Sequence, residues 1–537
     1  PQSVGGVVKL VTRPIPKAFG IEAGTEGSYS PTSSQNHPKG TSNLMVSGTA
    51  NNGHGGALLY SGTRGSDWRE HSATKIDDVM LKTRYAPNEV HTFNSLLQYY
   101  EGRAEMPGGL SRADYNADRF QSTRPYDEFW GRRQLASLGY QYQPDPQHKF
   151  NIQSFYTYTL RSGYLDQGKN LTLSPRQYWV RGIEPRYSQS FNLGQTAHEV
   201  GVGYRYVSES THELRYYSPA KSGVLPTGDS PYDRDTQSGT QANAFYIDDR
   251  IDVGDWTITP GMRYEHIQSY QNNYIKGTKQ EISYNAPLPA LNVVYHLNDA
   301  WNIYGNTEGS FGTVQYSQIG KAVDSGSIEP EKARTWELGT RFDNSIVKAE
   351  VGLFLINFNN QYDSNQTNDS VSARGKTRHT GLESQIRYDL SDLSPKLENV
   401  SAYASYAYVN AVIREEGDTH GNQVPFSPKN KGTLGLDYTP GNWFFNVNSE
   451  YQSGQFADNA NTVKESADGS TGRIPGFMLW GARVAYDFGP QMADLNLAFG
   501  VKNIFDQAYF TRSYDDNNKG IYAGQPRTLY MQGSLKF

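Results

Sequence analysis

The chain contains no cysteine, so its chemistry must come from charged, amide and hydroxyl side chains. Disulfides, thiol catalysis and zinc–thiolate sites are therefore excluded. The 11 histidines are scattered, without an HExxH motif or a close pair, which disfavours a metal site. The sequence also contains no GxSxG nucleophile elbow. We therefore expect a protein that is not an enzyme and that holds no cofactor.

Arginines in polar surroundings are better candidates for a binding site. A planar guanidinium pairs bidentately with carboxylates and stays charged in proteins. Arg161 has the polar parity of an alternating segment and lies at its end, whereas Arg176 and Arg234 lie in long polar stretches. The plainer alternative is that such arginines are solvated or pair with nearby acids, as Arg234 could with Asp233 and Asp235.

The elements that must position these side chains are β-strands, because apolar and polar residues alternate along much of the chain. Successive side chains of a strand point to opposite faces, so each such segment has one apolar and one polar face. Clear cases of this alternation are the segments 150–161, 256–265, 495–502 and 529–537.

Ten short, turn-like links predict ten hairpins, and two more strands, at 20–30 and 527–537, bring the count to 22. Long polar segments, which we expect to be loops, separate the hairpins. The short links are 51–56, 86–90, 143–148, 208–211, 253–255, 297–300, 343–347, 391–399, 439–442 and 489–494, and the long segments are 102–133, 162–196, 219–240, 312–332, 360–378, 412–430, 454–474 and 504–526.

This arrangement predicts an all-β fold, a 22-stranded antiparallel transmembrane β-barrel of the outer membrane. A mean hydropathy of −0.71 and a hydrophobic share of 36% fit a barrel, because lipid contacts only every second residue. The aromatic share of 13% argues against disorder and suits interfacial girdles. A soluble lectin or glycosidase is the alternative, but it does not need loops that are long at one end only. The net charge of −5 gives no reason to expect nucleic acid as a partner.

A barrel of 22 strands has a wide lumen and normally carries a plug. We predict that residues 1–19 are the C-terminal remnant of a plug domain, and that residues 20–537 are the barrel with long extracellular loops. The first residues lack the basic and apolar regions of a signal peptide, so we expect a truncated or processed chain.

Several segments resemble TonB-dependent outer-membrane receptors. They are 5–16 (GGVVKLVTRPIP), 329–342 (EPEKARTWELGTRF), 381–383 (GLE) and 501–537, which ends on Phe537. Loops normally diverge fastest, yet loop segments here are similar to those of the ferric dicitrate receptors in this family. These segments are 106–119, 161–189, 230–236, 359–369 and 514–530.

The resemblance implies active uptake of ferric citrate (diferric dicitrate) across the outer membrane of a Gram-negative cell. The TonB complex would supply the energy, and an N-terminal domain would signal to an inner-membrane regulator. We expect this chain to lack most of the plug, the TonB box and the signalling domain, and hence to bind weakly or leak. A receptor for another ferric siderophore, for haem or for cobalamin is an alternative, and so is an ungated porin-like channel if the chain is natively complete.

The same resemblance implies a ligand set. Arg161, Arg176 and Arg234 would bind citrate carboxylates, and Gln366 and Asn517 would supply neutral hydrogen bonds. The iron arrives already held by citrate, so no protein metal ligand is expected. Hydrogen bonds to charged groups contribute about 1.5–3 kcal/mol each. Three or four that converge would support a micromolar or tighter complex.

Overall fold

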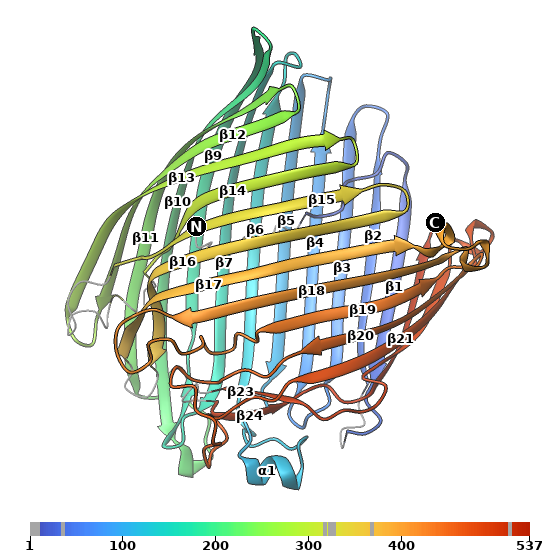
Figure 1. The fold of residues 1–537 in the computed structure, drawn as a ribbon. Helices are drawn as coiled ribbons and strands as arrows, with labels where there is room; N and C mark the ends of the chain where they lie inside the picture. The colour runs from blue at the N-terminus through green and yellow to red at the C-terminus, as the bar shows by residue number, and fades with distance from the viewer. Residues whose placement is uncertain (1–10, 34–37, 315–318, 320–328, 366–369, 514–517) are drawn as a thin grey trace.

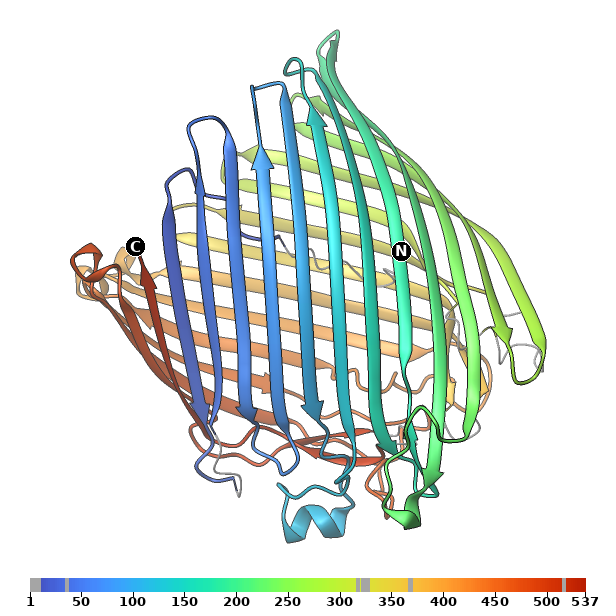
Figure 2. The ribbon, with the colours of Figure 1, turned by 180° about the vertical axis from the view of Figure 1, so that it is seen from behind.

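The strands of the computed structural model form one closed antiparallel barrel (Figures 1 and 2). The structure describes residues 11–33, 38–314, 319, 329–365, 370–513 and 518–537. The barrel closes where β25 pairs with both β22 and β1. Its strands are β1 Gly20–Tyr29, β2 Lys39–Thr49, β3 His54–Ser66, β4 Ala73–Tyr85, β5 His91–Glu105, β6 Glu128–Tyr142, β7 His148–Asp166, β9 Arg176–Leu193, β10 Thr196–Pro219, β11 Tyr232–Val253, β12 Trp256–Asn273, β13 Thr278–Asn298, β14 Trp301–Gly312, β15 Glu331–Asp343, β16 Val347–Asn365, β17 Ser370–Asp389, β18 Val400–Ile413, β19 Asn430–Tyr438, β20 Trp443–Gln452, β21 Phe477–Asp487, β22 Asn496–Lys502 and β25 Thr528–Lys536.

The main sheet contains 23 strands within the described residues, and one of them, β8 (Asn170–Leu173), only bridges the tips of β7 and β10. The remaining 22 strands form the wall, which confirms the predicted fold class. The long connections carry further elements (Figure 1). These are α1 Arg112–Ala117, the hairpin of β23 Phe510–Ser513 and β24 Gly520–Ala523, and the 3₁₀ turns Ala220–Ser222, Leu390–Asp392, Pro395–Leu397 and Pro490–Met492.

The outer wall is apolar, as the alternation predicts. Leu58, Leu81 and Leu97 lie opposite one another on neighbouring strands, and all three side chains are exposed on the outside. The residues next to them in sequence have the opposite parity and face the lumen; Lys82 is one of these. Exposed leucines on one face and charged residues on the other are the signature of a wall between lipid and water.

Aromatic residues gather where the strands meet the short turns. Trp256 packs against Tyr295 with ring centroids 4.6 Å apart, and Trp443 packs against Tyr486 at 4.7 Å. Each pair joins two neighbouring strands next to a short connection. Amphipathic rings favour the boundary between lipid and water, so this belt marks one membrane interface.

The predicted turn at 208–211 is wrong, because these residues lie inside the continuous strand β10. The hairpin instead turns at Gly194–Gln195, with Leu193 paired directly to Thr196. Gly194 has a φ of +62°, a conformation that favours glycine at the first central position of a two-residue turn. The number of hairpins is unchanged, so the strand count is unaffected.

The long polar segment 162–196 is largely strand and not loop, and the second part of 219–240 belongs to β11. β7, β9, β10 and β11 contain 19, 18, 24 and 22 residues. A tilted strand needs only about 9–11 residues to cross a bilayer. All four strands meet short turns at one end, so their extra length projects from the membrane at the long-loop end.

A carboxylate ties three of the long connections together at that end. Glu465 accepts hydrogen bonds from Arg112 Nε and Nη2, both at 2.8 Å, and it also pairs with Arg512. The Arg512 side chain is buried and donates a second bond to the carbonyl of Gly469 at 2.7 Å. The bonds from Arg112 and Arg512 lower the pKa of Glu465 to about 2. We call Arg112, Glu465 and Arg512 the loop ion cluster.

Asp127 is a second acid at the long-loop end, and it is fully buried where β6 begins. Its Oδ1 accepts the backbone N–H of Asp166 at 2.6 Å, whereas its Oδ2 has no hydrogen-bond partner among the described residues. Burial raises the pKa of Asp127 from 3.8 to about 6. The folded state therefore favours the protonated acid.

This burial predicts that the local structure loosens as the pH rises. Because the folded pKa is the higher one, the stabilising contribution of protonated Asp127 is complete below about pH 3.8 and is lost as the pH rises through about 6. The amide of Asp166, corrected for intrinsic exchange, should be better protected from hydrogen exchange at pH 5 than at pH 8. Asp127→Asn should abolish this difference. Equal pH dependence in the variant and the wild type would contradict the assignment.

Candidate ligand-binding site

The structure brings the three predicted arginines together. Arg161, on the projecting part of β7, lies opposite Arg176, the first residue of β9. On its other side, Arg176 lies opposite Glu213 of β10, and Arg234 comes from the next strand, β11. Directly opposed residues share a face of the sheet. The three arginines therefore form one patch across four strands, where we had expected two of them in loops.

The parity of β9 places this patch on the lumen side. Ile183 and Tyr187 have odd numbers and are exposed on the outer wall. Arg176 has the opposite parity, which it shares with Arg186, a residue that lines a cavity inside the barrel. Arg161 and Glu213 are directly opposed to Arg176 and so face the same way. The patch lines the inner wall at the long-loop end.

Glu213 holds two of the arginines. Its Oε1 forms an ion pair with Arg176 Nη2 at 2.8 Å and accepts a hydrogen bond from Arg234 Nη1 at 2.7 Å. The Glu213 side chain is 20% exposed, and the arginines are 33% and 29% exposed. A shared oxygen at these distances holds two cations side by side, which their repulsion would otherwise prevent.

The neighbouring acids have other partners. Asp233 pairs with Arg215 at 2.7 Å, and Asp235 pairs with His212 at 2.9 Å. Arg234 is therefore ion-paired, as the alternative predicted, but its partner is Glu213 from the adjacent strand and neither of the two neighbouring acids.

Arg161 differs from the other two arginines. Its guanidinium carbon lies 5.3 Å from the centre of the Phe129 ring, a cation–π arrangement that leaves the charge unneutralised. Within the described part of the chain, no acid forms an ion pair with Arg161. This side chain remains available to an anion that enters from the long-loop end.

The two remaining predicted ligands, Gln366 and Asn517, lie outside the described residues, so their positions relative to the patch stay predictions. Sequence reasoning missed Glu213, because the wrong turn at 208–211 broke the parity of β10 just before it. Reading β10 as one strand gives Glu213 the parity of the lumen face. No group of three or more potential metal-ligating side chains occurs among the described residues.

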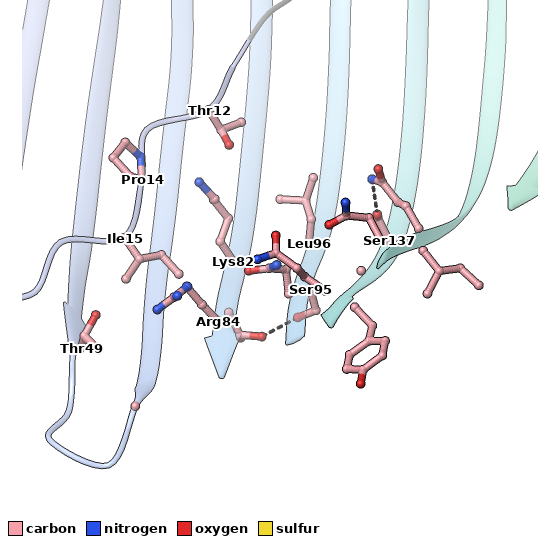
Figure 3. Close-up of a pocket in the computed structure, with 18 of the residues that line it drawn as sticks. Thr12, Pro14, Ile15, Thr49, Lys82, Arg84, Ser95, Leu96 and Ser137 are labelled. Atoms are coloured by element: carbon pink, nitrogen blue, oxygen red, sulfur yellow. Dashed lines mark hydrogen bonds between the residues drawn. The ribbon is translucent and has the colours of Figure 1, made fainter. Parts of the chain in front are cut away.

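A cavity of about 1010 Å³ lies at the other end of the lumen (Figure 3). Its lining includes Asn51 and Gly53 of a short turn, the inward-facing Lys82 and Arg84, and Ile15 of the N-terminal segment. Lys82 donates a hydrogen bond to the carbonyl of Arg13. This cavity lies where the N-terminal segment contacts the wall, far along the strands from the arginine patch, and we do not assign the ligand to it.

The comparisons with known proteins agree with this fold. The sequence profile described as TonB dependent receptor-like, beta-barrel, matches residues 29–504. The chain belongs to this family, whose members are outer-membrane proteins of Gram-negative bacteria, and it is an outer-membrane barrel. No helix in the described ranges is long and apolar enough to cross a bilayer.

One solved structure is similar over the whole chain. It is the unliganded ferric citrate transporter FecA, with 81% identity, a TM-score of 0.98, and coverage of 100% of this chain and 81% of that one. The siderophore receptor PiuA from Acinetobacter baumannii shares the fold at 14% identity and a TM-score of 0.80, over 98% of this chain and 82% of that one.

Curated relatives are more distant. The metal-pseudopaline receptor CntO of Pseudomonas aeruginosa is 23% identical over 73% of this chain and 58% of its own length. The ferrichrome outer membrane transporter/phage receptor of Escherichia coli is 24% identical over 61% of this chain and 43% of its own length. The chain therefore spans about half the length of these curated relatives.

Proposed function

We propose that this chain is the barrel of a receptor that binds ferric citrate, as diferric dicitrate, and takes it up in dependence on the TonB complex. The observation that carries the proposal is the patch of Arg161, Arg176 and Arg234 on the lumen wall. The 81% identity to a ferric citrate transporter supports the same ligand.

The chemistry of the patch suits a polycarboxylate that already holds its iron. Citrate oxygens surround the metal, so the protein needs donors for the outer carboxylates and no metal ligands. Guanidinium groups supply such donors in pairs and keep their charge. The strands hold the backbone of these residues in the paired wall, so the backbone needs no further ordering when the ligand binds.

The other members of the class fit the patch less well. A catecholate or haem site would depend on aromatic rings or histidine, and an uncharged hydroxamate complex has no carboxylate for three arginines. The metal-pseudopaline and ferrichrome receptors are 23% and 24% identical to this chain, a level that supports the fold alone.

The remaining partners belong to the whole receptor. The TonB complex would supply energy from the inner membrane, and an inner-membrane regulator would receive a signal. We infer that residues 1–19 are the end of a plug. In the described part of this segment, the carbonyl of Pro16 accepts a hydrogen bond from Thr49 Oγ1 at 2.8 Å, which places the segment against the first strands. The proposal assigns no catalytic step to the chain.

Titration of the purified full-length receptor, as its gene encodes it, tests the ligand. Ferric citrate should bind with micromolar or tighter affinity, as expected for three or four charge-assisted contacts. A ferric tris-catecholate and a ferric hydroxamate should show no saturable binding in the same detergent. Tight binding of either complex together with no binding of ferric citrate would reject the proposed function.

A further inference from the structure

Glu213 occupies the position that a ligand carboxylate is expected to take. We propose that Glu213 is an internal competitor for the ligand: its carboxylate fills the guanidinium sites of Arg176 and Arg234 until a multiply charged anion displaces it. This inference rests on the proposed function, because it deals with the same patch. It adds a residue that sets which anions can bind there.

The geometry supports competition over a purely structural bond. A single oxygen, Glu213 Oε1, lies 2.8 Å from Arg176 Nη2 in an ion pair and accepts a hydrogen bond from Arg234 Nη1 at 2.7 Å. These nitrogens, Arg176 Nη2 and Arg234 Nη1, are two of the donors that a citrate carboxylate would need. A bound carboxylate and the Glu213 carboxylate cannot both occupy the position against these two nitrogens, so one must leave.

The competitor is built to be displaced. Glu213 and both arginines are partly exposed to the lumen, so none of these charges would be stranded in a dry interior if the pair separates. The glutamate side chain has three rotatable bonds and can turn away while β10 stays paired on both sides. The strands thus keep the arginines in place for the incoming ligand.

The charges explain why the ligand must be multivalent. Glu213 neutralises one of the two positive charges it contacts, and no acid in the described part of the chain forms an ion pair with Arg161 beside them. An anion with one carboxylate would only exchange one ion pair for another. An anion that contacts Arg161 as well as Arg176 and Arg234 gains an interaction that Glu213 does not make. The patch therefore discriminates against singly bound and weakly charged anions.

The variant Glu213→Gln tests the competition, because it keeps the shape of the side chain and removes its charge. Ferric citrate and iron-free citrate are titrated separately into the full-length wild type and the variant. We expect ferric citrate to bind roughly tenfold more tightly to the variant, equivalent to about 1.4 kcal/mol. Iron-free citrate should gain more than about tenfold in affinity, so that the preference of the receptor for the iron complex becomes smaller.

Two further variants serve as controls. Glu184→Gln removes the same charge from the inner wall of the barrel at a position away from the patch, where Glu184 lies 3.6 Å from Arg205. This variant should leave the affinities for ferric citrate and for iron-free citrate unchanged. Glu213→Asp keeps the charge and should stay close to the wild type. Retention of the folded barrel is checked by heat-modifiable migration on a detergent gel.

The outcomes separate the two proposals. If the wild type binds ferric citrate but Glu213→Gln binds it equally well or more weakly, Glu213 is a structural support and the competition is rejected. The competition is also rejected if Glu184→Gln tightens binding as much, because the effect would then be one of general charge. If the wild type does not bind ferric citrate at all, the proposed function fails, and the competition fails with it.

Discussion

Replacing both Arg176 and Arg234 with alanine should weaken ferric citrate binding by at least about a hundredfold. Each guanidinium supplies charge-assisted hydrogen bonds of about 1.5–3 kcal/mol, and every 1.4 kcal/mol changes affinity about tenfold. The variant also leaves Glu213 without the two cations that it contacts, so an uncompensated negative charge faces the ligand. Calorimetric titration of the full-length receptor would measure the loss.

The control for this experiment is Arg186→Ala. Arg186 lies on the same strand as Arg176 and faces the lumen, but it pairs with Asp248 at 2.8 Å and is nearer the short turns. The Arg186→Ala variant should bind ferric citrate with the affinity of the wild type. The single variants should not sum to the double one, because both arginines share Glu213. Unchanged affinity in the double variant would remove the patch as the binding site.

Replacing Glu465 with alanine should release the loop ion cluster while the barrel stays intact. Removing one partner of a buried ion pair typically costs 3–5 kcal/mol. The lower end, about 3 kcal/mol, is expected here, because Arg512 keeps its bond to the Gly469 carbonyl and Glu465 is itself partly exposed. Hydrogen exchange should speed up in β23 and β24 and around α1. Among the described residues, the ion-pair partners of Glu465 are Arg112 and Arg512, which lie in long connections outside the barrel wall, so the unfolding temperature of the barrel should hardly change.

The matched control is Glu416→Ala, which removes an exposed acid from a different long connection. Faster exchange in both variants would mean that the loop ion cluster has no special role. The pH dependence gives a second check. Because the folded pKa of Glu465 is lowered from 4.5 to about 2, its contribution is complete above about pH 4.5 and is lost as the pH falls towards 2. Protease resistance of these loops should therefore persist from pH 7 down to about 5.

The alternation of residue types was enough to predict the barrel and the inward parity of Arg161, and the short links predicted the strand number although one of them was misplaced. The same alternation was misleading in the parts of the strands that project from the membrane. There, water contacts both faces of a strand, so apolar residues no longer mark one of them, and the polar residues at 208–211 in β10 looked like a turn. Arg176 and Arg234 were assigned to loops for the same reason.

Contacts between distant parts of the chain were beyond the sequence. The pairing of Glu213 with Arg176 depends on the register that the two-residue turn at Gly194 imposes. Arg112 and Glu465 are 353 residues apart, and no local pattern brings them together. The sequence and the resemblance named the arginines, but only the strand register shows what holds them.

The closure of the barrel between β1 and β25 has a consequence for folding. Ile21 and Phe537 exchange backbone hydrogen bonds, so the first and last strands of the wall meet across almost the entire sequence. Until that contact forms, both edges of the sheet carry unpaired backbone groups that can recruit another chain. Such a distant pairing also slows folding of the barrel, because a very long loop must close before the contact contributes to stability. The pairing of β25 with β1 thus closes the whole barrel. Before this pairing forms, the protein is most prone to misassembly.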